Sequence, residues 1–133
     1  GYLPPREPLA DVAVHMQTTA ALAAAHPELV LIGSGYSYLQ ELLPHAAQYQ
    51  VRTGGAGMVG LGRMALSYPT MPADVLAGEP LDAKLICRTF SDCTTGPRLG
   101  EVSGCFPLDD HYKKHEARVA IAAAKRAKRS RTD

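Results

Sequence analysis

The sequence predicts an α/β fold with parallel strands. Helical and strand patterns alternate along roughly the first 80 residues, in the order helix, strand, helix, strand, helix. This alternation is typical of parallel sheets whose strands are connected by helices. Both strand patterns are short apolar runs that end in glycine, as expected of strands buried on both faces. The chain has 133 residues, 46% hydrophobic and 20% charged, which is enough for one compact domain with a core.

The first helix and strand follow a proline-rich start. Apolar residues recur at helical spacing and predict an amphipathic helix that ends before Pro27. They are Leu9, Val12, Met16, Ala20 and Ala23. The run "LVLIG", residues 29–33, predicts a fully buried parallel strand, and "GSG" at 33–35 ends it.

The second helix and strand repeat this order. Residues 36–54 read as helix, in which Pro44 either introduces a kink or restarts a second short helix. "GGAGMVGLGR" supplies a turn and a second buried strand at about 57–61. "PADVLAGEP", residues 72–80, predicts a short helix closed by Gly78.

The periodic pattern weakens after residue 84. Residues 85–114 are rich in Gly, Pro, Ser, Thr and Asp and predict a long ordered loop. Residues 114–130 have high helix propensity, but they lack a broad apolar face, so we expect the helix to fray. Two strands alone do not make a stable sheet. Either further strands escape detection or the chain is a piece of a larger fold, and we favour the second interpretation.

Charge and cysteine content limit the class of protein. The net charge is +1, and more than half of the 14 Lys and Arg residues lie in the tail, 113–133. This tail has no interleaved aromatic residues, so we expect a solvated terminus and no nucleic-acid partner. No apolar run approaches the roughly 20 residues that span a bilayer, so no membrane partner is expected. An odd number of cysteines without a secretion signal indicates reduced thiols and a cytoplasmic location.

The two strand ends predict an anion site. They read "IGSGY" and "GLGRM", and the carboxyl ends of neighbouring parallel strands face the same side. Gly33, Ser34 and Gly35 would offer backbone N–H groups and one hydroxyl, Gly62 another N–H, and Arg63 the counter-charge. Helices that start directly after each strand would add their N-terminal dipoles. The alternative is a tight turn at "GSG", with Arg63 reaching solvent or pairing with an acid.

Other candidate residues favour packing over chemistry. Cys87, Cys93 and Cys105 are three thiols without a C-x-x-C pair, so inert thiols are favoured over a metal site. His111 and His115 have metal-ligand spacing but sit in a charged segment, and we interpret them as surface residues. Tyr36 and Tyr38 follow the first glycine turn and could line a cofactor, although packing is the favoured role.

Three segments together resemble a known family. "LVLIGSGYSYLQELLPHAAQY", "GMVGLGRMALSYPTMPADVLAGEPLD" and "ICRTFSDCTTGPRLGEVSGCFPLD" are similar, in order and spacing, to the C-terminal part of old yellow enzyme proteins. The resemblance covers about residues 2–112 and is stronger to the NADH:flavin oxidoreductase branch related to dienoyl-CoA reductase. It implies the last two β/α units of an FMN-binding (β/α)8 TIM barrel plus a C-terminal extension. The implied domains are a barrel part, 1–112, and a basic tail, 113–133, helical or frayed.

The resemblance also implies an activity and a cofactor. Family members pass a hydride from NADH or NADPH to FMN and on to an activated alkene. "IGSG" would end the seventh strand and "GLGR" the eighth, so Gly33, Ser34, Gly35, Gly62 and Arg63 would hold the FMN phosphate.

Departures from the family limit what this chain does. The strands that carry the family's catalytic residues are missing, so no catalytic residue can be placed and we expect the chain to be inactive alone. The missing barrel part would lie on another chain, or a homo-oligomer would form. Cys93 and Cys105 match the last cysteine spacing of iron–sulfur relatives, but Ile86 and Thr89 replace the first two ligands, so no cluster is expected. The alternative function is a non-enzymatic fragment or interaction module that uses exposed strand edges.

Overall fold

The computed structural model describes residues 6–129, and residues 1–5 and 130–133, which belong to the outer ends of the two expected domains, lie outside it. The chain divides into two compact units, which we call the sheet unit (residues 6–89) and the helical unit (residues 90–129). The boundary expected from the resemblance lies between residues 112 and 113, not between 89 and 90. It concerns a larger barrel and stays a prediction.

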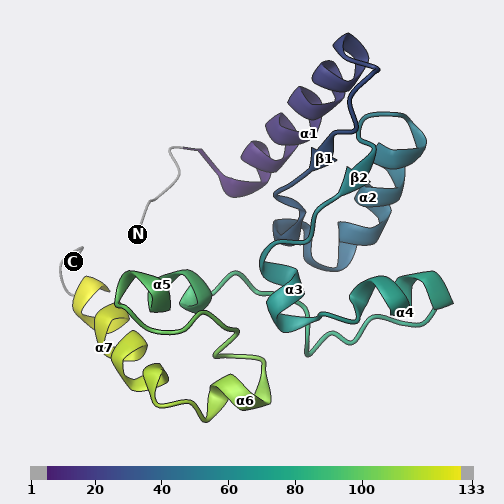
Figure 1. Cartoon of the computed structure of the whole chain (residues 1–133). Helices are drawn as coiled ribbons and strands as arrows, with labels where there is room; N and C mark the ends of the chain where they lie inside the picture. The colour runs from purple at the N-terminus through teal and green to yellow at the C-terminus, as the bar shows by residue number, and fades with distance from the viewer. Residues whose placement is uncertain (1–5, 130–133) are drawn as a thin grey trace. The chain divides into compact units, whose positions relative to one another are not determined.

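The sheet unit contains two strands and five helices (Figure 1). In chain order they are α1 (Pro8–Ala25), β1 (Ile32–Gly33), the 3₁₀ helix η1 (Tyr36–Leu42), α2 (Leu43–Arg52), β2 (Met58–Val59), α3 (Arg63–Ser67) and α4 (Met71–Ala77). The predicted order of helix, strand, helix, strand, helix is therefore confirmed.

Helix α1 begins and ends where its sequence dictates. The Glu7 carboxylate accepts a hydrogen bond from the Ala10 N–H at 3.0 Å, and Pro8 stands at the first helical position, where no N–H is needed. His26 closes the helix and Pro27 prevents its continuation. Val12 is the buried residue of this helix, and the partly buried Met16 packs against the core of the sheet unit.

The two strands pair in parallel, as predicted, with Ile32 opposite Met58 and Gly33 opposite Val59. Each strand has two residues, fewer than the predicted 29–33 and 57–61. The expectation of fully buried strands is wrong, because Ile32 is 60% exposed and Met58 53%. Helices cover only the other face, where Val59 packs against the core. Within residues 6–129 the strands form no closed barrel, so the barrel assignment stays a prediction.

Pro44 restarts a helix rather than bending one. Gln40 has φ 52° and ψ −117°, which interrupts the helical backbone, and α2 begins at Leu43 with Pro44 in its first turn. Farther along, Gly78 adopts the left-handed conformation (φ 74°) that terminates α4. The structure therefore agrees with a helix start at Pro44 and with a helix end at Gly78.

The core of the sheet unit joins η1, α2, α3 and α4 to the segment that follows α4. Its buried members are Tyr36, Leu43, Met64, Tyr68, Met71, Ile86 and Cys87. The Cys87 N–H donates to the Met64 sulfur at 3.3 Å. Segment 85–87 was expected to be loop, and it is loop, but it completes the core.

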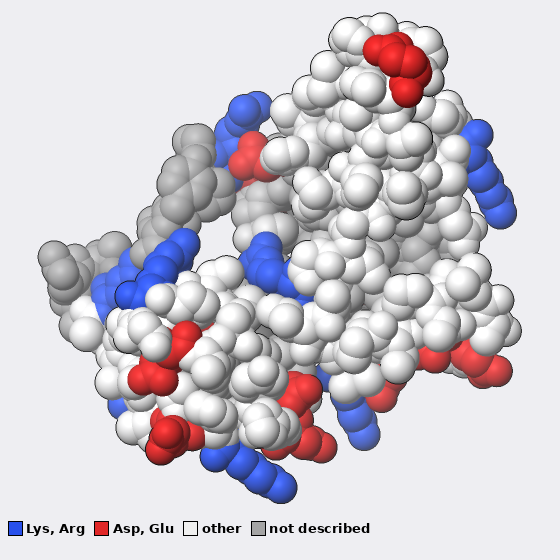
Figure 2. All heavy atoms as spheres, in the orientation of Figure 1, with Lys and Arg blue, Asp and Glu red and all other residues white. Residues whose placement is uncertain are grey.

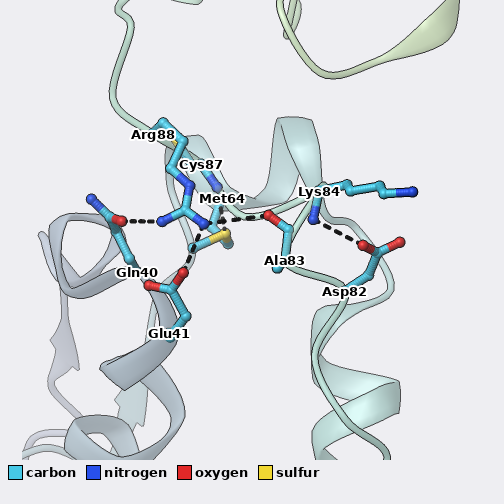
Figure 3. Close-up of polar contacts among 8 residues, drawn as sticks. All are labelled: Gln40, Glu41, Met64, Asp82, Ala83, Lys84, Cys87 and Arg88. Carbon is cyan, nitrogen blue, oxygen red and sulfur yellow. Dashed lines mark hydrogen bonds and ion pairs between the residues drawn. The ribbon is translucent and has the colours of Figure 1, made fainter.

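Arg88 fixes the end of this segment to η1 (Figure 3). Its guanidinium forms an ion pair with Glu41 at 2.7 Å and donates hydrogen bonds to the side-chain oxygen of Gln40 and to the carbonyl of Ala83. The pKa of Glu41 is lowered, first by a backbone hydrogen bond at Glu41 and then by the hydrogen bond from Arg88. The Arg88 cluster therefore fastens two segments that are distant in sequence.

The helical unit corrects the expected long loop at 85–114. It contains α5 (Asp92–Arg98), α6 (Asp110–Lys113) and α7 (Ala117–Arg129). Helix α5 forms although it contains Gly96 and Pro97. Position 96 requires glycine, because a Cβ there would lie 2.6 Å from the Val102 carbonyl oxygen. Asp109 caps α6 by accepting from the His111 and Tyr112 N–H groups.

Helix α7 agrees with the high helix propensity of the tail, but the expected fraying is not found in Ala117–Arg129. Ala117 and Ile121 are buried against Phe106, and Lys125 binds the Asp92 carboxylate and the Phe90 carbonyl. Two buried positions one turn apart and one ion pair thus attach the helix, which extends to Arg129, to the rest of the unit. Figure 2 shows acidic and basic side chains mixed over this unit. None of the helices between residues 6 and 129 is long and apolar enough to cross a bilayer.

Candidate anion-binding site

The turns that follow β1 and β2 meet, as the parallel arrangement predicts. The Gly60 N–H donates to the Gly33 carbonyl at 2.8 Å, immediately beyond the paired strands. The Met64 N–H donates to the Ser37 hydroxyl oxygen at 3.2 Å, and this bond is buried. The two segments that sequence reasoning brought together therefore touch at two points.

The first turn has one closed and one open glycine. Gly33 is buried, and a Cβ on it would lie 2.7 Å from the Tyr36 hydroxyl oxygen. Ser34 and Gly35 are exposed, and Gly35 has φ 89°, a left-handed conformation that glycine adopts without strain. A Cβ on Gly35 would meet no atom within 4 Å, so its backbone is open to a ligand.

The second turn brings in the cation. Gly62 is exposed, with no atom within 4 Å of the position of a Cβ. Arg63 is half-buried, and its guanidinium carbon lies over the Tyr38 ring, 4.6 Å from the centroid. Within the described range 6–129, no carboxylate forms an ion pair with Arg63. The alternative interpretation, in which Arg63 pairs with an acid, has no support in this part of the chain.

The predicted contribution of helix dipoles is small. The elements after the two strands begin where expected, at Tyr36 and Arg63, but η1 is a 3₁₀ helix of seven residues with a break at Gln40. Helix α3 has only five residues. Because aligned peptide dipoles add along a regular helix, neither element supplies much charge. An anion at these turns would depend on the Arg63 side chain and on individual N–H groups.

Tyr36 and Tyr38 have different environments. Tyr36 belongs to the core, as its favoured packing role required, and its buried hydroxyl has no hydrogen-bond partner among residues 6–129. Burial raises the pKa of this hydroxyl above the ordinary tyrosine range. Tyr38 is half-buried, and its ring contacts Arg63. The pairing of Tyr38 with Arg63 was not predicted from the sequence, because only the folded structure shows which residues of η1 and α3 meet.

The residues considered for metal binding are placed in other roles. Among residues 6–129, no group of three or more His, Cys, Asp or Glu side chains could hold a metal ion. The His115 Nδ1 accepts a hydrogen bond from the Ala117 N–H at 3.2 Å and so caps the start of α7. His111 and His115 lie with Tyr112 in one aromatic cluster. All three cysteines lie in the described part of the chain, and none forms a disulfide there.

Comparisons with protein-family models, with curated proteins and with solved structures find no match to this chain. The resemblance to flavin oxidoreductases therefore stays a prediction from sequence, and the geometry of the two turns stands by itself.

Proposed function

We propose that the sheet unit binds the phosphate group of FMN and is the C-terminal part of an FMN-dependent, ene-reductase-like NAD(P)H oxidoreductase with a (β/α)8 fold. The observation that carries the proposal is Arg63, which has no carboxylate partner among residues 6–129 and stands beside two open glycine turns. NAD(P)H as electron donor and a cytoplasmic location are inferred from the resemblance and from the cysteine content.

The residues at the two turns fit a phosphate. A phosphate monoester is doubly charged and has three terminal oxygens, which match the planar fork of donors on a guanidinium. Arg63 would supply the charge, and the exposed Ser34 hydroxyl an additional donor. The backbones at Gly35 and Gly62 have room for an oxygen to approach, because nothing occupies the place of a side chain.

Under this proposal residues 1–133 supply only one part of a flavin enzyme. Bound FMN would relay hydride between a nicotinamide and an acceptor, and this chain would contribute binding and orientation of the phosphate end. We place no residue of this chain at a reacting atom. We therefore expect no turnover from these 133 residues alone, and activity only together with further barrel strands.

Binding of FMN compared with riboflavin tests the proposal directly. Riboflavin lacks the phosphate, so the wild-type chain should bind FMN more tightly, as measured by flavin fluorescence quenching. Arg63→Ala should lower FMN affinity about 10-fold or more, since it removes a hydrogen bond to a charged group, and should leave riboflavin binding unchanged. Arg52→Ala is the matched control, because Arg52 is an exposed arginine at the end of α2. Equal losses from both substitutions, or equal affinity for FMN and riboflavin, would contradict the proposal.

A second candidate function is a strand-pairing module. Val30, Ile32 and Met58 are 69%, 60% and 53% exposed, and strand alternation places them on the sheet face opposite Val59. No third strand among residues 6–129 pairs with β1 or β2. An open sheet edge is a template for another strand. Sedimentation at increasing concentration tests pairing with a second copy: Ile32→Lys should shift the protein toward monomer, and an unchanged distribution would contradict self-pairing.

A further inference from the structure

The 3₁₀ helix η1 holds the first residues of α3 through two adjacent side chains. Ser37 accepts the hydrogen bond of the Met64 N–H inside the protein. Tyr38, the next residue, lies against the guanidinium of Arg63, the residue before Met64. The backbone at the start of α3 and its arginine side chain are thus both held by the first turn of η1.

A ring face fixes a guanidinium without occupying its donors. The attraction is between the cation and the π-electrons of the ring, so the five N–H donors of Arg63 remain available to a ligand. An arginine held in this way loses less side-chain freedom when it binds an anion, because part of the ordering has already occurred. A carboxylate partner would also order the arginine, but it would compete with the anion for the donors.

The core of the sheet unit does not account for the position of Tyr38. The core of the sheet unit includes Tyr36, and Leu39 packs against it, but Tyr38 belongs to neither group. Its ring is half-buried and has one described cationic neighbour, Arg63. The contact between the two side chains is therefore the feature of Tyr38 that needs a reason.

We infer that Tyr38 is a positioning residue, which holds the Arg63 guanidinium ready for the phosphate of a phosphate monoester. The inference rests on the proposed function for the ligand, although the pairing of the two side chains can be tested without any ligand. Tyr38 would act through Arg63, and its hydroxyl would not be required.

Four variants test this role by FMN titration. Tyr38→Phe keeps the ring and should leave affinity within about 2-fold of wild type, whereas Tyr38→Leu should weaken FMN about 3- to 5-fold, the scale of an exposed cation–π contact. In an Arg63→Ala background, Tyr38→Leu should have no further effect, because the interaction is already absent. Riboflavin affinity should not change in any variant. A loss of similar size in both backgrounds, or for riboflavin, would overturn the inference.

The proton resonance of the Arg63 Nε–H gives a readout that needs no ligand. A ring current from Tyr38 should shift this resonance upfield in wild type and in Tyr38→Phe, and the shift should disappear in Tyr38→Leu. If Tyr38→Leu does not fold, a nuclear Overhauser contact between the Arg63 side chain and the Tyr38 ring in wild type decides the pairing. Absence of ring-current shift and contact would overturn the inference. Failure of wild type to bind FMN, with the pairing intact, would overturn the proposed function and limit Tyr38 to fixing the α3 arginine.

Discussion

The ring of Tyr36 lies where a side chain at position 33 would stand. A Cβ built on Gly33 would be 2.7 Å from the Tyr36 hydroxyl oxygen and 3.0 Å from a ring carbon. Tyr36 is only 1% exposed, so the ring is enclosed and has no free space into which to turn. Gly33, the last residue of β1, is therefore required by the protein core, whatever ligand the following turn binds.

Gly33→Ala should destabilise the sheet unit because it forces a core side chain to move. Overpacking of this kind typically costs about 1–3 kcal/mol, measured as the change in free energy of unfolding in urea. Gly62→Ala is the control, since Gly62 has φ −76° and open space around it. That variant should stay within about 0.5 kcal/mol of wild type. Equal effects at the two glycines would contradict the packing described for Tyr36.

Tyr36→Phe should not destabilise the protein at neutral pH. The hydroxyl is buried without a partner among the described residues, so its removal eliminates a desolvation penalty of about 1–3 kcal/mol, offset by some loss of packing. We expect the free energy of unfolding to stay equal or increase. A loss of more than about 1 kcal/mol would show that the hydroxyl has a partner that matters.

The same variant should change the response to alkaline pH. Burial raises the Tyr36 pKa, so above the ordinary tyrosine value of about 10 the unfolded chain releases this proton while the folded chain retains it. Stability therefore falls as the pH rises through this range. Tyr36→Phe should make the decline shallower, with a remainder from Tyr68, whose pKa is raised chiefly by its hydrogen bond to Asp74. Urea midpoints at several pH values above 9 would measure the slope, and identical slopes would count against the assignment.

Arg88→Lys should weaken the attachment of residues 82–88 to η1. An ammonium group lacks the planar fork of donors with which Arg88 binds Glu41 and Gln40. The Arg88 and Glu41 side chains are both partly exposed, so the expected loss in the free energy of unfolding is small. Lys84→Arg controls for the exchange of cations, since the Lys84 side chain is exposed. Pulsed hydrogen exchange should be faster than in wild type at residues 82–88 of the Arg88→Lys variant. It should be unchanged there in the Lys84→Arg variant. Unchanged protection there would mean that the Arg88 cluster does not hold the segment.

Ile121→Ala should unfold the helical unit selectively. Ile121 is 1% exposed and packs on Phe106, and loss of such a side chain costs about 2–5 kcal/mol. Val119→Ala is the matched control in the same helix, because Val119 is 73% exposed. Hydrogen exchange should lose protection in residues 110–129 and keep it in residues 58–75. Loss of protection throughout both regions would contradict the division into two compact units.

Helix boundaries were the most predictable part of this fold, because they depend on neighbouring residues. Pro27, Pro44 and Gly78 act through their own backbone geometry, and each ends or starts a helix at the expected place. Burial was less predictable. The apolar runs at 29–33 and 57–61 indicated strands covered on both faces, but coverage depends on how many elements surround the sheet. The described residues supply helices on one side only.

The candidate site was predicted in location but not in detail. Parallel pairing correctly brought Gly33 and Arg63 to the same end of the sheet. The contact of Tyr38 with Arg63 was not predicted, because it depends on the path of a turn. Helix α5 was not predicted, because Gly96 and Pro97 both disfavour a helix locally. The close approach of Ile121 and the Val102 carbonyl, which requires glycine at position 96, exists only in the folded structure.

The uncovered side of the β1–β2 sheet has a practical consequence for anyone who purifies this chain. An exposed apolar patch is formed by Val30, Ile32 and Met58. Patches of this kind bind hydrophobic dyes such as ANS and the substrate-binding sites of chaperones. A preparation should fluoresce with ANS while it is still folded, and should lose protein to container walls and precipitates as it is concentrated. We expect a mild detergent, or co-expression with a polypeptide that covers this face, to reduce these losses.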